Sequence, residues 1–105
     1  MPHLIFCTCP NAEAAERIAV RLVGEKLAAC VNVLPGIRSV YQWQGEIETA
    51  QEHLLLIKSP KVCYAKIEAA IKALHPYELP EIIAVEIESG SADYLKWIDS
   101  CLSTN

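Results

Sequence analysis

The hydrophobic positions of the chain follow two spacings, one typical of strands and one typical of helices. Residues 3–9 form a short apolar run that stops at Pro10, which predicts a buried strand ending in a turn. After Asn11, a residue type that favours helix N-caps, apolar residues recur at helical spacing as far as Leu27. Gly24 lies inside this predicted helix, and we expect a close approach of the helix to a sheet there.

The middle of the chain predicts a long hairpin. Residues 30–43 are β-like, and the Pro-Gly pair at residues 35–36 predicts a bend or bulge in the strand. Residues 44–46 (Gln-Gly-Glu) predict the hairpin turn. The return strand, about residues 47–58, contains the continuous apolar run 53–57, which is typical of a strand buried on both faces.

The last third of the chain predicts a helix, a strand and a short final helix. Residues 59–60 (Ser-Pro) favour a helix start, because Ser supplies a capping hydroxyl and Pro fits the first turn. The helix ends before the loop of residues 75–80, whose two prolines fix the backbone. Residues 82–87 predict a strand, and Ser91 caps the final helix. The order predicts an α+β fold of the ferredoxin-like βαββαβ type with an extra C-terminal helix, in which helices cover one face of a four-stranded antiparallel sheet.

Length and composition predict a single domain spanning residues 1–105 that associates with other subunits. No linker-like stretch divides the 105 residues, and a domain of this size folds without disulfide or zinc staples. The apolar fraction of 52% exceeds the usual range of about 45–50%. Because small domains have proportionally more surface to cover with polar groups, this surplus indicates a face buried against another subunit. Tyr41 and Trp43 on the long hairpin are candidates for that contact, or alternatively for a ligand site.

The charge balance argues against two classes of partner. With 9 Lys and Arg against 13 Asp and Glu, the net charge is −4 and the basic residues are dispersed, so nucleic acid is not an expected partner. No apolar run reaches the ~18 residues that a membrane span needs, so we expect no membrane association. The N-terminus lacks a basic, cleavable leader, and we expect a cytoplasmic protein.

The five cysteines are expected to be reduced thiols, because their number is odd and no secretory signal precedes them. Cys63 and Cys101 occupy apolar positions of predicted helices and are expected in the core. Cys7 and Cys9 lie on the same face of the first predicted strand, about 6.6 Å apart at ~3.3 Å per residue. Such a pair can share one soft ion, copper(I) or zinc. The alternative is that both thiols are ordinary core residues beneath a helix.

The three histidines differ in their expected surroundings. His75 follows the second predicted helix, and we expect an exposed imidazole there. It is either a metal ligand or pH-responsive group, or a hydrogen-bonding partner of the last helical carbonyls. His53 is most simply a strand residue at an edge or interface, and His3 is expected to be terminal and solvated.

The sequence does not favour an enzyme. It has no nucleophile elbow, no phosphate-binding Gly-rich loop and no H-E-x-x-H motif. Glu78 and Glu81 flank Pro80 and form a candidate carboxylate pair for a hydrolase or transferase, but solvated loop glutamates are the simpler interpretation. No nucleophile and base can be paired from the sequence.

Four segments together resemble one family, the CutA divalent-ion-tolerance proteins. They are residues 27–32 (LAACVN), 39–45 (SVYQWQG), 75–81 (HPYELPE) and 93–97 (DYLKW), and they are spread over most of the chain. The resemblance implies a ferredoxin-like protomer in a tight homotrimer similar to that of the PII signalling proteins, with the long hairpin pairing across subunits.

The resemblance also implies a metal-related function. The family is linked to tolerance of copper and other divalent metals, and its proposed ligands fall here on Cys7 and His75, with Glu81 as a weaker oxygen ligand. Some members have a second His directly before the one matched by His75. Leu74 stands at that place here, and Cys9 is our candidate substitute. The expected function is binding of copper or another divalent ion in response to metal stress, with copper not required for folding.

The alternative function is that of a PII-like signalling or scaffold trimer. Such a trimer would bind a small molecule or an unidentified protein partner in clefts between subunits, and metal tolerance would be an indirect effect.

Overall fold

The secondary structure follows the order that the hydrophobic pattern predicts. The computed structural model describes residues 1–102. Strands and helices alternate along these residues, with a short 3-10 helix before the second α-helix. In chain order the elements are β1 (His3–Cys9), α1 (Ala12–Gly24), β2 (Cys30–Trp43), β3 (Glu46–Ser59), η1 (Lys61–Cys63), α2 (Tyr64–Leu74), β4 (Ile82–Glu86) and α3 (Ala92–Asp99).

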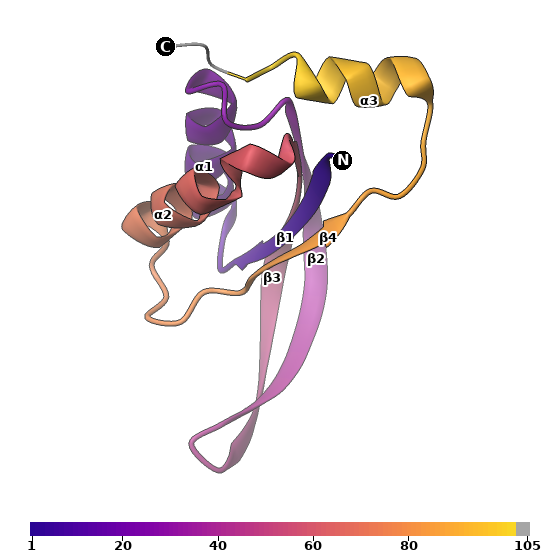
Figure 1. Cartoon of the computed structure of the whole chain (residues 1–105). Coiled ribbons are helices and arrows are strands. Elements are labelled where there is room, and N and C mark those ends of the chain that lie inside the picture. Colours follow the sequence, from indigo (N-terminus) through magenta and orange to yellow (C-terminus); the bar gives the residue numbers. More distant parts are fainter. Residues whose placement is uncertain (103–105) are drawn as a thin grey trace.

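The strands form one antiparallel sheet in which β1 is an inner strand. The strand order is β2-β3-β1-β4. Helices α1 and α2 lie together on one face of the sheet, whereas α3 lies at one end of the molecule and the β2–β3 hairpin projects from the other end (Figure 1). This is a ferredoxin-like α+β arrangement with an additional C-terminal helix, so the predicted fold is confirmed.

The hairpin has the turn and the bend that the sequence predicts. The turn residues Gln44 and Gly45 have positive φ angles of 51° and 83°, as in the tight turns that suit the twist of paired strands. A register shift between Leu34 and Ile37 marks a bulge in β2, where Gly36 has a φ of 73°. Both features confirm the predicted hairpin.

The core lies between one face of the sheet and helices α1 and α2. Alternation along β1 places Ile5, Cys7 and Cys9 on this face, and all three side chains are fully buried. The helices contribute apolar stripes with the period of an α-helix. Other core members are Ala15, Ile18 and Leu22 of α1, Leu55 and Ile57 of β3, and Ile67 and Ile71 of α2.

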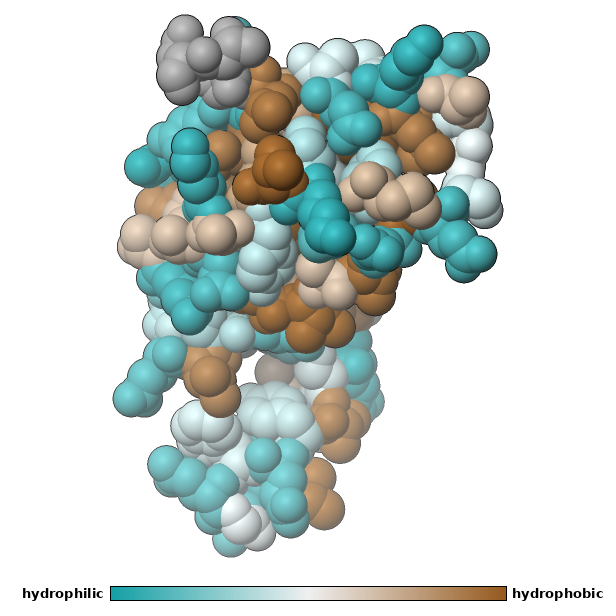
Figure 2. Space-filling model, in the orientation of Figure 1, coloured by the Kyte–Doolittle hydropathy of each residue, from teal (hydrophilic) through white to brown (hydrophobic). Residues whose placement is uncertain are grey.

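The opposite face of the sheet is apolar and only partly covered. Strand register places Phe6 beside Ile83 and Leu4 beside Val85 on this face, which we call the open face. Ile83 is 55% exposed and Val85 is 48% exposed. Figure 2 shows hydrophobic side chains at the surface of the main body and of the hairpin. A sheet face of this kind is typical of a surface that binds another chain.

The apolar run of β3 is fully buried on one face only. Leu55 and Ile57 point into the core and are fully buried, whereas Leu54 and Leu56 point to the open face and are half-buried. The prediction of two buried faces is therefore wrong for the chain by itself, because α1 and α2 both pack on the same face.

Two local predictions are wrong. Gly24 ends α1 instead of lying inside it, and a Cβ there would meet no atom within 4 Å, so no close helix–sheet contact accounts for it. Ser59 is the last residue of β3, paired with His3, and its buried hydroxyl has no hydrogen-bond partner among the described residues. Because pairing holds Ser59 in the sheet, the 3-10 helix begins after Pro60 and the predicted Ser cap does not form.

Truncating the core should destabilise the protein much more than truncating the surface of the same helix. We expect Ile18→Ala to lower the free energy of unfolding by about 2–5 kcal/mol, because a fully buried side chain leaves a cavity. Val20→Ala, at a position that is 60% exposed, should change it by less than about 0.5 kcal/mol. Urea unfolding at a fixed protein concentration measures both, and equal effects would contradict the assigned core.

Candidate metal centre

The two cysteines of β1 lie on the face that α1 and α2 cover. Cys7 and Cys9 are both fully buried, and Cys9 is the last residue of the strand. The chain then turns into α1, whose N-cap is Asn11 with its side-chain oxygen accepting a hydrogen bond from the Ala14 N–H at 2.8 Å. The predicted placement of both thiols on one face of the strand is confirmed.

His75 is buried, so the prediction of an exposed imidazole is wrong. Only 7% of the residue is exposed, and its Nε2 lies 2.6 Å from the carbonyl oxygen of Thr8 in β1. Its Nδ1 accepts a hydrogen bond from the Tyr77 N–H at 3.1 Å. These partners favour the neutral imidazole with its proton on Nε2, donated to Thr8.

The imidazole does not bond the last helical carbonyls, which was the second predicted role. The backbone N–H of His75 does so instead, donating to the Ile71 carbonyl at 2.8 Å. The backbone then turns extended at His75, with φ −75° and ψ 134°, which ends α2 and directs the side chain to β1. The restriction that Pro76 places on the residue before it explains this conformation.

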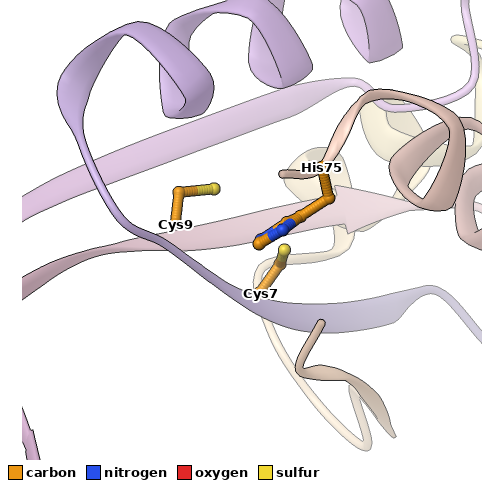
Figure 3. A group of neighbouring side chains, drawn as sticks. All are labelled: Cys7, Cys9 and His75. Carbon is orange, nitrogen blue, oxygen red and sulfur yellow. The ribbon is translucent and has the colours of Figure 1, made fainter. Parts of the chain in front are cut away.

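Cys7, Cys9 and His75 come together in one cluster. Their donor atoms all lie within 4.8 Å of one another. Figure 3 shows the three side chains converging, with the cysteines on β1 and the histidine at the end of α2. Two metal–thiolate bonds of about 2.3 Å, the length seen with zinc, would together span at most about 4.6 Å. The 4.8 Å limit on the cluster is close to this span, so at most a shift of a few tenths of an ångström would let both sulfurs bind one ion.

The two thiols lie within 4.8 Å of each other, and this proximity makes them chemically different. The interaction with Cys9 raises the pKa of Cys7, and burial and the negative charges of Cys9, Glu81 and Glu52 raise it further. The same interaction lowers the pKa of Cys9, although burial and Glu52 oppose the shift. Cys9 therefore loses its proton first, and a metal ion that binds both sulfurs must displace the proton of Cys7.

Glu81 does not join this cluster. It lines a neighbouring cleft with Glu78, and it acts on Cys7 only through its charge. The candidate carboxylate pair thus faces a cleft that is also lined by Tyr41 and Trp43 of the hairpin.

The other predicted residues lie elsewhere. His53 is a half-buried residue of β3 paired with Cys9, so it lies in a strand as predicted, but β3 is an inner strand and not an edge. His3 was predicted to be solvated but is half-buried: its ring packs edge-on against Tyr64 with 6.3 Å between ring centroids. Cys63 is buried as predicted, whereas Cys101 follows α3 and is only half-buried.

Tyr77 and Glu52 form a partly buried hydrogen bond that the sequence pattern did not predict. The Tyr77 hydroxyl donates to Glu52 Oε2 at 2.8 Å, and Glu52 is only 6% exposed. One signal in the sequence points to this pair. Glu52 directly precedes the apolar run of residues 53–57, and strand alternation assigns it to the open face. Burial, the hydrogen bond to Glu52 and the Glu52 charge raise the pKa of Tyr77 well above its usual value.

Fold and site together define a class: a ferredoxin-like α+β chain with a buried dithiol–imidazole cluster at the end of an inner strand. A family model described as "CutA1 divalent ion tolerance protein" matches residues 3–101. The divalent-cation tolerance protein CutA of Thermus thermophilus is 47% identical over 98 residues, which cover 93% of this chain and 95% of that protein. The chain therefore belongs to the CutA1 divalent ion tolerance protein family.

Other relatives agree with this assignment. The chloroplastic protein CutA 1 of Oryza sativa is 44% identical over 90% of this chain, which spans about half (54%) of that longer protein. The crystal structure of CutA from Xylella fastidiosa has a TM-score of 0.94 and 50% identity, covering 97% of this chain and 98% of that one.

Across residues 1–102, the helices are too short or too polar to cross a bilayer.

The raised pKa of Tyr77 predicts a loss of stability at alkaline pH. Below the ordinary tyrosine pKa of 10.0 the phenol is protonated in both the folded and the unfolded state. As the pH rises above 10.0 the unfolded chain loses this proton first, so the free energy of unfolding decreases. We expect a smaller decrease in Tyr77→Phe, measured from urea midpoints at pH 9 and pH 11. Equal decreases in both proteins would contradict the role of the Tyr77 phenol.

Proposed function

We propose that this protein binds copper, as copper(I), or another thiophilic ion such as zinc through Cys7, Cys9 and His75. The proposal rests on the convergence of two thiols and an imidazole within 4.8 Å in a family named for divalent-ion tolerance. Soft thiolate donors favour copper(I) and zinc over magnesium or calcium. The protein would thereby contribute to metal tolerance by binding the ion, without catalysing a reaction.

The three ligands are not equally available. Both ring nitrogens of His75 are engaged in hydrogen bonds, one to Thr8 and one to Tyr77. Ligation by the imidazole therefore exchanges one of these bonds, whereas the sulfurs of Cys7 and Cys9 only need to lose protons. We infer that the sulfurs supply most of the affinity. Because Cys7 and Cys9 also pack as members of the apolar core, we infer that copper is not required for folding.

A copper(I) competition titration against a strong chromophoric chelator tests the site. We expect one competing copper per chain in the wild type, loss of that binding in Cys7→Ser and Cys9→Ser, and a smaller loss of affinity in His75→Gln. Cys63→Ser is the matched control, because Cys63 is buried and lies outside the cluster. Binding that survives both β1 substitutions, or that depends equally on Cys63, would disprove the assignment.

We also infer that the chain assembles as a homotrimer. The exposed apolar residues Ile83 and Val85 on the open face support association, as do the two sheet edges at β2 and β4. The number of subunits rests on the family resemblance, in which the long hairpin pairs across subunits as in the PII proteins.

We further propose one domain over residues 1–105 and a cytoplasmic location, where the free thiols stay reduced.

Charging the open face should disrupt the trimer. Ile83→Glu places a carboxylate on the apolar surface that another subunit would bury, so we expect monomers, unfolded chains or aggregates in size-exclusion chromatography with light scattering. Val62→Glu is the control, because Val62 is 74% exposed and belongs to η1 rather than to the sheet. A stable Ile83→Glu trimer would contradict the proposed interface.

A further inference from the structure

We propose that the loop of residues 75–81 is a gate over the metal cluster, held closed by the hydrogen bond between Tyr77 and Glu52. The gate rests on the proposed metal function for its purpose, but its first test needs no metal. Three observations carry it: the burial of the three ligating side chains, the way the loop is attached, and the hydrogen bond that joins the loop to β3.

The cluster is closed to solvent. Cys7 and Cys9 have no exposed surface, and His75 is 7% exposed. Assembly into an oligomer can only bury these side chains further. A metal ion or a chelator therefore reaches the two sulfurs only after some part of the protein has moved away from the end of β1, so ion exchange requires an opening step.

The elements around the cluster are held in different ways. Helix α1 is anchored by five buried apolar side chains, and α2 contributes Ile67 and Ile71 to the core. The 75–81 loop, which joins α2 to β4 (Figure 1), has no buried side chain after His75 within the chain. Segments with few buried apolar contacts open at the lowest free energy, so the loop is the part that we expect to move.

Side-chain hydrogen bonds attach the loop to the sheet at two points. At the start of the loop, the His75 imidazole bonds the Thr8 carbonyl of β1. Two residues later, the Tyr77 hydroxyl donates to Glu52 Oε2 of β3 at 2.8 Å, a bond that we call the latch. Pro76 lies between the two points and restricts the backbone, which couples the position of the imidazole to that of the phenol.

The latch controls access to the metal and does not bind it. Neither Tyr77 nor Glu52 belongs to the set of converging donor atoms. Because the latch is broken when the loop opens, removing it favours the open loop, and a hydrogen bond of ordinary strength changes the opening equilibrium about two- to tenfold. Tyr77 is therefore a positioning residue. Without the latch, metal entry and metal release speed up together, and the affinity, which is their ratio, changes little.

Labelling of the buried thiols with iodoacetamide measures the opening without a metal. When the loop closes faster than the reagent reacts, the labelling rate is proportional to the opening equilibrium constant. Trypsin releases Cys7 and Cys9 together in a peptide of residues 1–17 that contains no other cysteine, so mass spectrometry follows them selectively. In the assembled wild-type protein we expect a labelling rate that low urea concentrations hardly change, because an opening loop exposes little surface.

Tyr77→Phe should speed up this labelling about two- to tenfold, because it removes the latch. Tyr64→Phe is the matched control. It breaks a second Tyr–Glu hydrogen bond, from Tyr64 to Glu68 at 2.9 Å, which lies within α2 and stays formed when the loop opens. Tyr64→Phe should therefore leave the labelling rate of Cys7 and Cys9 unchanged.

Variants of Glu52 test the latch from its other side, and they also serve if Tyr77→Phe does not fold. Glu52→Ala should speed up labelling as much as Tyr77→Phe, and the double variant should be no faster than either single variant, since both remove the same bond. Glu52→Gln keeps an amide oxygen that accepts from the Tyr77 hydroxyl, so its labelling rate should stay within about twofold of the wild-type rate.

A copper arm separates the gate from the metal function. We expect copper(I) to transfer from Tyr77→Phe to an excess of chelator about two- to tenfold faster than from the wild type, with the equilibrium affinity unchanged within about twofold. Failure of copper to bind the wild type would disprove the metal function and leave the labelling result standing. Normal binding with an unchanged transfer rate would disprove the gate alone.

The labelling data overturn the gate in any of three cases. Equal acceleration in Tyr77→Phe and Tyr64→Phe, or a rate that rises steeply with urea, would mean that the thiols react after the whole chain unfolds. A rate that falls as the protein concentration rises would mean that the subunits must separate first. An unchanged rate in both Tyr77→Phe and Glu52→Ala would mean that another element opens.

Discussion

The docking of the 75–81 loop onto the end of β1 is the interaction on which the metal cluster and the neighbouring cleft depend. His75 leaves α2 in an extended conformation and hydrogen-bonds the Thr8 carbonyl, which ties the end of the helix to an inner strand. Two residues later, Tyr77 donates to Glu52 on β3. This short loop therefore positions an imidazole beside two thiols and a phenol in the wall of the cleft, and without it neither group of side chains would converge.

Alternation along β1 separates the thiol cluster from the neighbouring cleft. Cys7 and Cys9 point into the core, whereas Thr8 between them faces the cleft. The thiol pair lies near Glu81 and Glu52, whose negative charges raise the pKa of Cys7. Soft sulfur atoms suit a thiophilic metal ion.

Local patterns were sufficient to predict most of the fold, and long-range contacts account for what they missed. Hydrophobic spacing, the Asn11 cap and the Gln-Gly turn predicted the elements and their order, because these signals act within a few residues. The same-face placement of Cys7 and Cys9 followed from strand geometry alone. The burial of His75 did not, because it depends on a strand 67 residues away in the sequence. The bond between Tyr77 and Glu52 and the retention of Ser59 in the sheet are also products of tertiary pairing.

The proposed metal function requires Cys7, Cys9 and His75 to form a single site for a soft ion. X-ray absorption spectroscopy of the copper(I)-loaded protein tests it most directly, because the method counts the sulfur neighbours of the bound metal. We expect two sulfur neighbours per copper in the wild type and one in Cys9→Ser. A copper surrounded only by nitrogen and oxygen, or a sulfur count that Cys9→Ser leaves unchanged, would contradict it.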